Sequence, residues 1–187
     1  MPRIPLLGSD DAQKTAATVG VSSTAADLNV FRAWLHVPQL AGWLHELIMG
    51  LLWKGSLDAR LRELVIMRLG WSTNSDYEWT QHWRIATEFL QVDGDDLLAA
   101  RDWRTSDRFG PQERAILAAT DDVVAHGAIG DEAWHACATE IGDDPALLVE
   151  IVSVIGVWRM VSSMLRSMDV PLEDGVTSWP PDGDAPS

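Results

Sequence analysis

The sequence predicts an all-α protein, and three observations lead to this class. Gly and Pro residues separate a series of segments in which apolar residues recur at the spacing of a helix. No segment alternates apolar and polar residues over several positions, as a half-buried strand would. The chain has 187 residues with 47% hydrophobic content, which is enough to bury one sizeable core. We therefore expect one helical domain with two loose ends.

The first four predicted helices cover residues 25–36, 38–53, 56–71 and 75–91. Pro38 suits the first turn of the second helix, because a backbone N–H at that position would have no helical partner. Ser56 and Ser75 suit the N-caps of the third and fourth helices, where a side-chain oxygen can accept a backbone N–H.

The other four predicted helices cover residues 94–103, 111–126, 131–142 and 145–168. Pro111 and Pro145 suit the first turns of the helices that they open. The last helix contains the longest apolar stretch, LLVEIVSVIGVWRMV, which Glu150 and Arg159 interrupt. We interpret this segment as a buried core or interface helix and not as a membrane span.

The two ends of the chain differ in composition from the helical region. Residues 1–24 mix Pro, Gly, Ser and Asp with little periodicity, and residues 171–187 are rich in Pro and acidic side chains. We expect both ends to be extended or partly disordered. The predicted domains are therefore an N-terminal extension at 1–24, a helical domain at 25–170 and an acidic tail at 171–187.

Charge and cysteine content exclude several classes of function. The net charge is −14, and the 14 Lys and Arg residues form no basic run, so binding to a nucleic acid is not expected. The N-terminus lacks the regions of a secretory signal, which predicts a cytoplasmic protein without membrane contact. A single cysteine, Cys137, can form neither an intramolecular disulfide nor a CxxC pair.

An acid and an imidazole lie on the apolar side of the helix that begins at SDYEWTQHW, residues 75–83. On a helical wheel its apolar arc contains Trp79, Trp83, Ile85, Ala86, Phe89 and Leu90. Glu78 and His82 fall inside that arc and are neighbours, because residues four apart share a helix face. Burial and mutual interaction can bring such a pair to a coupled titration near neutral pH, as acid and base catalysis requires.

Structural roles could also explain this pair. Ser75 and Glu78 fit the capping box S-x-x-E, in which Glu78 reaches back to the backbone N–H of Ser75. His82 could be a hydrogen-bonded residue of the core.

The preceding helix places two charged residues on apolar sides. In SLDARLRELVIMRLGW, Arg68 projects from the main apolar arc and Glu63 lies among small and apolar residues. Buried charges require partners. Either Arg68 pairs with an acid such as Glu78 or Glu150 while Glu63 faces solvent or a subunit boundary, or these charges join His82 in one polar cluster.

These residues carry a resemblance to a known family. The helix with LRELVIMRLGW, followed by a short polar link and YEWTQH, resembles the carboxymuconolactone decarboxylase family and its alkylhydroperoxidase D-like (AhpD-like) superfamily. The resemblance is best over residues 56–91 and extends more loosely over 31–53, 110–124 and the last helix. It implies an all-helical AhpD-like bundle of about eight helices that assembles as a homo-oligomer, with trimers, hexamers and dimers all open.

The chain departs from the peroxidase branch of that superfamily, in which the second helix opens with C-x-x-C. Here Ser75 and Glu78 occupy the two cysteine positions, and Glu63 takes the position of an upstream Glu. Cys137 lies far along the chain and is interpreted as a small buried residue. What remains resembles the decarboxylase-type branch, whose site uses His and Glu for proton transfer without a cofactor.

The resemblance implies decarboxylation, or a related proton transfer, on a small carboxylated lactone or organic acid. His82, Glu78 and Glu63 are the candidate catalytic residues. Candidate substrate-binding residues are Arg68, Tyr77, Trp79, Trp83 and Ser75. Arg68 could hold a carboxylate through its paired donors, Tyr77 could bind a carbonyl, and the two tryptophans could exclude water.

Three alternatives stay open. The chain could have a peroxidase-like or other antioxidant activity, although it lacks the CxxC pair. It could be a non-catalytic oligomeric binding protein, in which the ten tryptophans serve only helix packing. Glu63, Glu78 and His82 could ligate a metal, but we expect none because structural zinc takes four ligands and no second His motif is present.

Overall fold

The computed structural model describes residues 2–186, which contain ten α-helices and no β-strand. The predicted all-α class is confirmed. Helices α4 (Pro38–Trp53), α8 (Pro111–His126) and α10 (Pro145–Met168) have the predicted bounds. All three begin at a proline, a residue that favours the first turn of a helix and therefore marks the start in the sequence.

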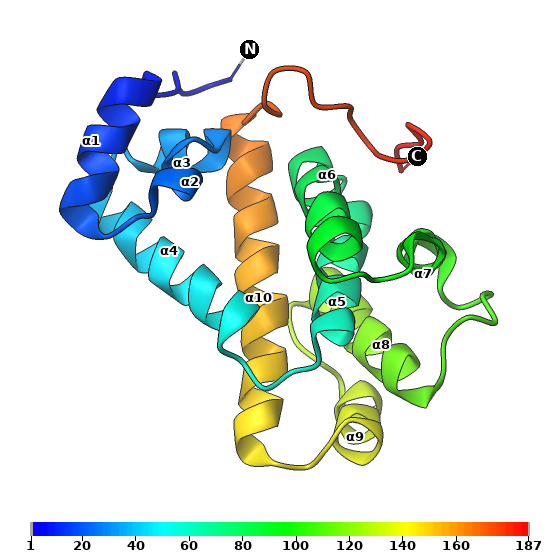
Figure 1. Cartoon of the computed structure of the whole chain (residues 1–187). Helices are drawn as coiled ribbons and strands as arrows, with labels where there is room; N and C mark the ends of the chain where they lie inside the picture. The colour runs from blue at the N-terminus through cyan, green and yellow to red at the C-terminus, as the bar shows by residue number, and fades with distance from the viewer. Residues whose placement is uncertain (1, 187) are drawn as a thin grey trace. The chain divides into compact units, whose positions relative to one another are not determined.

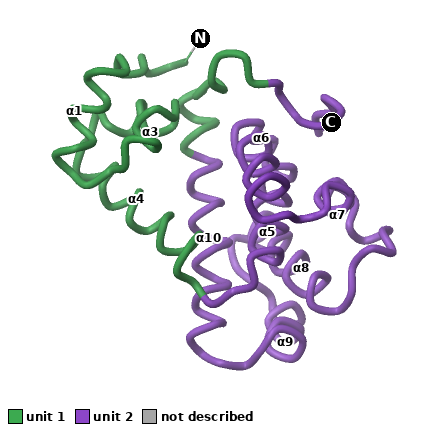
Figure 2. The backbone as a smooth tube through the Cα atoms, in the orientation of Figure 1, with its two compact units in different colours: residues 1–55, 164–176 green, residues 56–163, 177–187 purple. Residues whose placement is uncertain are grey.

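The described contacts group the chain into two compact units, shown in different colours in Figure 2. The first contains residues up to 55 together with 164–176, and the second contains 56–163 together with 177 onward. The predicted limits at residues 25 and 170 stay a prediction.

The first unit contains α1 (Ser9–Val19), α2 (Ser23–Ala26), α3 (Asn29–Trp34) and α4 (Figure 1). The prediction that residues 1–24 are extended was wrong for α1. This helix has Asp10 and Asp11 in its first turn, where the helix dipole favours negative charge, and it buries only alanines, Ala12 and Ala16. A stripe of alanines gives little hydrophobic signal in the sequence.

The second unit contains α5 (Ala59–Ser72), α6 (Asp76–Arg84), α7 (Gly94–Ala99), α8, α9 (Asp131–Glu140) and most of α10. Helix α5 is buried on all sides, as expected of a central core helix. Helix α5 packs against α8, and Ile116 and Leu117 of α8 are fully buried, as are Ile151 and Ile155 of α10. By length and composition alone α10 could cross a membrane, a property shared by core helices of soluble proteins.

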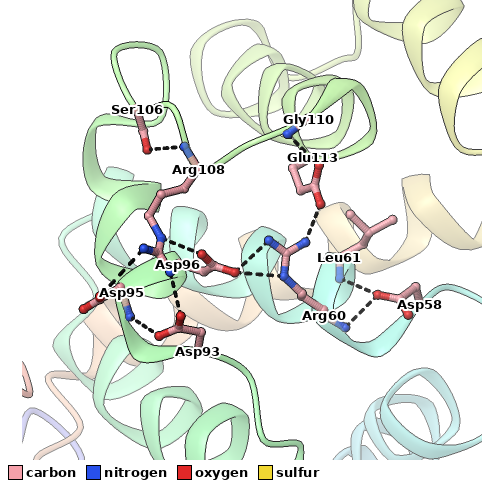
Figure 3. Close-up of polar contacts among 10 residues, drawn as sticks. All are labelled: Asp58, Arg60, Leu61, Asp93, Asp95, Asp96, Ser106, Arg108, Gly110 and Glu113. Carbon is pink, nitrogen blue, oxygen red and sulfur yellow. Dashed lines mark hydrogen bonds and ion pairs between the residues drawn. The ribbon is translucent and has the colours of Figure 1, made fainter.

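A polar network fixes the start of α5 (Figure 3). Asp58 caps the helix by accepting the backbone N–H groups of Arg60 and Leu61, so the predicted cap at Ser56 was two residues too early. The Arg60 guanidinium donates to Asp96 of α7 at 2.7 Å and also pairs with Glu113 of α8. The first turn of α5 is thereby tied to two neighbouring helices.

The predicted helix 75–91 is interrupted. Helix α6 ends at Arg84, and residues Ile85–Phe89 form a π-helix, η1, in which the Leu90 N–H bonds the Ile85 carbonyl. The wider turn changes the angle between successive side chains within it, so Phe89, predicted on the apolar arc of an α-helix, is 64% exposed. Helix α7 is likewise shorter than predicted and continues as a 3-10 turn, η2 (Ala100–Asp102).

The acidic tail is docked and not disordered over its described residues in the second unit. Trp179 is buried and packs against Trp71 and Trp79. Its backbone N–H is within hydrogen-bond distance of Asp76 Oδ1 and Thr80 Oγ1, at 3.1 and 3.2 Å. The prediction of a loose end was wrong here because one aromatic residue anchors a segment of otherwise disorder-prone composition.

Candidate functional site

The candidate site lies between α5 and α6, which pack closely against each other. A Cβ atom on Gly70 would lie only 3.0 Å from the backbone nitrogen of Trp79. Glycine therefore allows the two helix backbones to come close. The short link between the helices then turns α6 so that its buried face, with Glu78 and His82, is directed to α5.

His82 and Glu63 form a buried hydrogen bond between these two helices. The distance from His82 Nδ1 to Glu63 Oε2 is 2.8 Å, and Glu63 is fully buried. Arg62, also buried, donates from Nε to the other Glu63 oxygen at 3.4 Å. The Glu63 carboxylate is therefore paired on both oxygens, as a buried charge requires.

Glu78 lies on the other side of the imidazole. Its Oε2 is 3.7 Å from His82 Nε2 and has no hydrogen-bond partner among the described residues. Burial raises the pKa of Glu78 to about 7; an imidazolium at His82 opposes this change and the Glu63 carboxylate adds to it. Near neutral pH the Glu78 carboxyl group can therefore either give or accept a proton.

The histidine itself is subject to opposing effects. Burial lowers the pKa of His82, but Glu63 and then Glu78 favour the charged ring and raise this pKa above its ordinary value. Arg62 acts against that increase. Glu78 and His82 thus compete for one proton, and the carboxylic acid with neutral imidazole has the same net charge as the carboxylate with imidazolium.

A tryptophan from α10 completes the surroundings of the ring. Trp158 Nε1 donates to His82 Nε2 at 3.1 Å, and the two rings meet edge to face with centroids 5.7 Å apart. Because Nε2 accepts this bond, the ring proton is on Nδ1, where it is donated to Glu63. The observed contacts therefore fit the neutral Nδ1–H tautomer of His82.

The capping-box explanation for Glu78 does not hold. The Ser75 N–H bonds the Gly70 carbonyl, and neither Ser75 nor Glu78 makes a side-chain cap of α6. The Ser75 hydroxyl is buried and has no partner among the described residues. Ser75 and Glu78 thus leave two unsatisfied polar atoms one helical turn apart.

Arg68 lies in a different cluster from His82. Its guanidinium donates to both carboxylate oxygens of Asp121 on α8, and its remaining bonds go to the carbonyls of Ala100 and Arg101. The expected partners were wrong, since Glu150 instead accepts the backbone N–H groups at residues 56 and 57. The arginine beside Glu63 is Arg62.

The aromatic residues predicted to bind substrate also make their described contacts away from His82. Trp79 donates from Nε1 to the Pro180 carbonyl and stacks with Trp83, which places both in the cluster under the tail. Arg101 lies over the rings of Trp71 and Trp79. Tyr77 is buried on α6. Of the predicted site residues, the described contacts bring Glu63, Glu78 and His82 together.

Sequence reasoning missed Arg62 and Trp158. Arg62 is adjacent to Glu63 in sequence, but on the helical wheel Arg68, and not Arg62, projects from the main apolar arc. Trp158 is 76 residues from His82, and no local pattern connects them. The one signal in the sequence is that Trp158 lies in a long apolar helix, which predicts a buried residue but not a contact with His82.

The residues present supply acid and base groups and no accessible thiol. Burial raises the pKa of the Cys137 thiol to about 11, and its sulfur lies near the Ala115 carbonyl on α8. Within residues 2–186 no group of three or more His, Cys, Asp or Glu side chains is arranged to hold a metal ion. The site can hold or move protons at Glu78 and His82.

Comparisons with known proteins show what this chain resembles in sequence and fold. Residues 38–122 match the model of the carboxymuconolactone decarboxylase family. This segment includes Glu63, Glu78 and His82. A search of curated proteins gave no match.

Several solved structures share the fold at low sequence identity. An uncharacterised peroxidase-related protein with an AhpD core from Ralstonia eutropha has a TM-score of 0.71 at 17% identity, covering 98% of this chain and 97% of its own. A peroxidase-related protein from Silicibacter has a TM-score of 0.72 at 14% identity, with 94% and 91% covered. The debrominase Bmp8 in complex with 2,3,4-tribromopyrrole has a TM-score of 0.68 at 18% identity, with 91% of both chains covered.

Proposed function

Because residues 38–122 match the carboxymuconolactone decarboxylase family and the fold is shared with an AhpD-core protein, we propose that the chain catalyses cofactor-free proton transfer at Glu78 and His82. The substrate class is a small carboxylated lactone or related organic acid, and the reaction is decarboxylation. The observation that carries the proposal is the buried arrangement of Glu63, His82 and Glu78, in which Glu78 has a pKa of about 7.

The proposed roles follow from the contacts of each group. Loss of CO2 leaves an electron pair that a neighbouring carbonyl delocalises, and a proton must then reach carbon. Glu78 supplies that proton, because its Oε2 has no other partner and its carboxyl group is partly protonated near pH 7. Glu78 regains a proton from water after product leaves.

The other residues support this step. His82 takes or returns a proton through its coupling with Glu78, and Glu63 fixes the orientation of the ring. Ser75 lies one turn before Glu78, and its unpaired hydroxyl can donate to a substrate oxygen. Arg68, Tyr77, Trp79 and Trp83 remain proposed substrate-binding residues, although the described bonds of Arg68 are made to Asp121 and carbonyls.

The test is CO2 release with product NMR from 4-carboxymuconolactone and a panel of carboxylated lactones and β-keto acids. We expect turnover by the unmodified protein and a loss of at least about 100-fold in Glu78→Gln. Glu88→Gln is the matched control, since Glu88 is an exposed acid on the adjoining π-helix. Absence of turnover on every compound, or full turnover in Glu78→Gln, would contradict the proposal.

The alternative to the proposed decarboxylase activity is a peroxidase-like activity. Ser75 and Glu78 stand where that branch has its cysteines, and the buried Cys137 is a poor thiolate. Thiol-dependent peroxide consumption would favour the alternative. A chain with neither activity would favour the non-catalytic binding protein.

We further propose a cytoplasmic homo-oligomer, with a small organic acid or lactone as partner and neither nucleic acid nor membrane involved. Support comes from large exposed apolar side chains on α4, which include Trp43 at 69% and Trp53 at 55% exposed. Such surface is commonly covered by a protein partner. Light scattering after gel filtration tests this assembly, and a monomer at micromolar concentration would contradict it.

A further inference from the structure

Trp158 is buried in α10 and makes a directed contact with the candidate site. Its indole is 2% exposed, and its N–H donates to His82 Nε2 at 3.1 Å. An indole nitrogen can donate a hydrogen bond but cannot accept one. The contact therefore distinguishes between the two protonation states of the histidine.

The neutral ring with its proton on Nδ1 satisfies every described partner. Nδ1–H donates to Glu63, and the Nε2 lone pair accepts from Trp158. An imidazolium would carry N–H groups on both nitrogens, so the N–H on Nε2 would face the N–H of the indole. In a buried site the indole N–H would then have lost its acceptor, which is costly.

The charged groups around the ring oppose this preference. Arg62 and Glu63 from α5 and Glu78 from α6 are the ionisable groups that act on His82, and the two carboxylates favour the imidazolium. Glu78 Oε2 is 3.7 Å from Nε2, which is too long for a hydrogen bond. As arranged, Nε2 bonds the indole and not the Glu78 carboxyl group.

We propose that Trp158 is a positioning residue that holds neutral His82 as the Nδ1–H tautomer and opposes protonation of Nε2, which shifts the shared proton of the site toward Glu78. The inference deepens the proposed function, because it decides which group of the coupled pair delivers the proton. It also holds if the substrate is a different one, since it concerns the free protein.

The first test needs no substrate and no substitution at Trp158. In the full chain labelled with 15N-histidine, the His82 nitrogens are observed by NMR and assigned by their loss in His82→Asn. We expect the neutral form of the ring to carry its proton on Nδ1 at every pH at which that form is populated. A neutral ring protonated on Nε2 would overturn the proposal.

The second test is Trp158→Phe, which keeps an aromatic ring for the edge-to-face contact and removes the N–H. We expect the His82 titration midpoint to rise by about 0.5 to 1 pH unit, as for the loss of one hydrogen bond. The protonated fraction of Glu78, followed by the infrared band of its carboxylic acid, should fall in parallel. Glu78→Gln identifies that band.

Trp103→Phe is the matched control. It removes an indole N–H that donates to Asp121, at a buried position of the same unit. We expect this variant to leave the His82 midpoint unchanged. An unchanged or lower midpoint in Trp158→Phe would overturn the inference, whereas a missing decarboxylase activity would contradict only the proposed function.

Discussion

Glu63 and His82, 19 residues apart, share a 2.8 Å hydrogen bond that joins two buried helices. The bond connects the charge of Arg62, through one carboxylate, to the imidazole that lies beside Glu78. A change at any of these groups should therefore be measurable at the others.

Glu63→Gln should lower both the His82 pKa and the stability of the protein. The amide keeps an acceptor for Nδ1–H but removes the negative charge that favours the imidazolium. It also leaves Arg62 buried without a charged partner, which costs about 3–5 kcal/mol. Chemical denaturation and histidine NMR measure the two effects.

Adding Arg62→Met to Glu63→Gln provides the control. Because methionine carries no charge, the double variant should recover part of the lost free energy of unfolding. If the two substitutions were simply additive, Arg62 and Glu63 would not be coupled as the contact indicates.

Glu78→Gln should change how stability depends on pH. The pKa of Glu78 is raised from 4.5 to about 7, so ionising this group costs the folded state more than the unfolded chain. The unmodified protein should therefore lose stability as pH rises from about 4.5 through 7, and the variant should lack this loss. At pH 8 the difference can reach about 3 kcal/mol in favour of the variant.

Urea denaturation at pH 5 and pH 8 measures this difference. Glu88→Gln, at an exposed position, should keep the pH dependence of the unmodified protein. Parallel curves for Glu78→Gln and the unmodified protein would show that the Glu78 carboxyl group does not have a raised pKa.

Gly70→Ala should destabilise the contact between α5 and α6. The added Cβ would meet backbone atoms of Trp79 at 3.0 and 3.3 Å, and backbone cannot rotate away as a side chain can. We expect a loss of about 1–3 kcal/mol. Gly50→Ala in α4 meets nothing within 4 Å, so it should be neutral or stabilise by up to about 1 kcal/mol. Thermal unfolding compares the two variants, and equal effects would argue against the close approach at residue 70.

Trp179→Ala should release the tail from α6. The substitution removes the ring that packs on Trp71 and Trp79. The remaining ion pair between Asp182 and Arg101 is partly exposed and by itself contributes little to holding the tail. We expect proteinase K to cleave near residue 179 faster than in the unmodified protein, as read by mass spectrometry. Trp53→Ala, at an exposed position, should leave cleavage near residue 179 unchanged.

Local sequence signals predicted the helical class and the helices that begin with proline, because those signals act within a few residues. They also predicted that Glu78 and His82 face the core, and both are buried. Thr80 is a polar residue outside the apolar arc of its helix, yet it is buried beside Trp179, and no pattern within the helix indicates a contact with a segment about 100 residues away. Arg62 and Trp158 were missed for related reasons, since each is identified by its partners and not by its spacing.

The π-helix at Ile85–Phe89 has a consequence for comparing this chain with its relatives. Its wider turn uses more residues than an α-helical turn, so the faces before and after it are offset in register. A relative with an uninterrupted helix at this place would need an alignment gap shortly after His82 for its later residues to correspond. Alignments that forbid gaps inside helices would pair the wrong residues across this region, even where the two folds superpose.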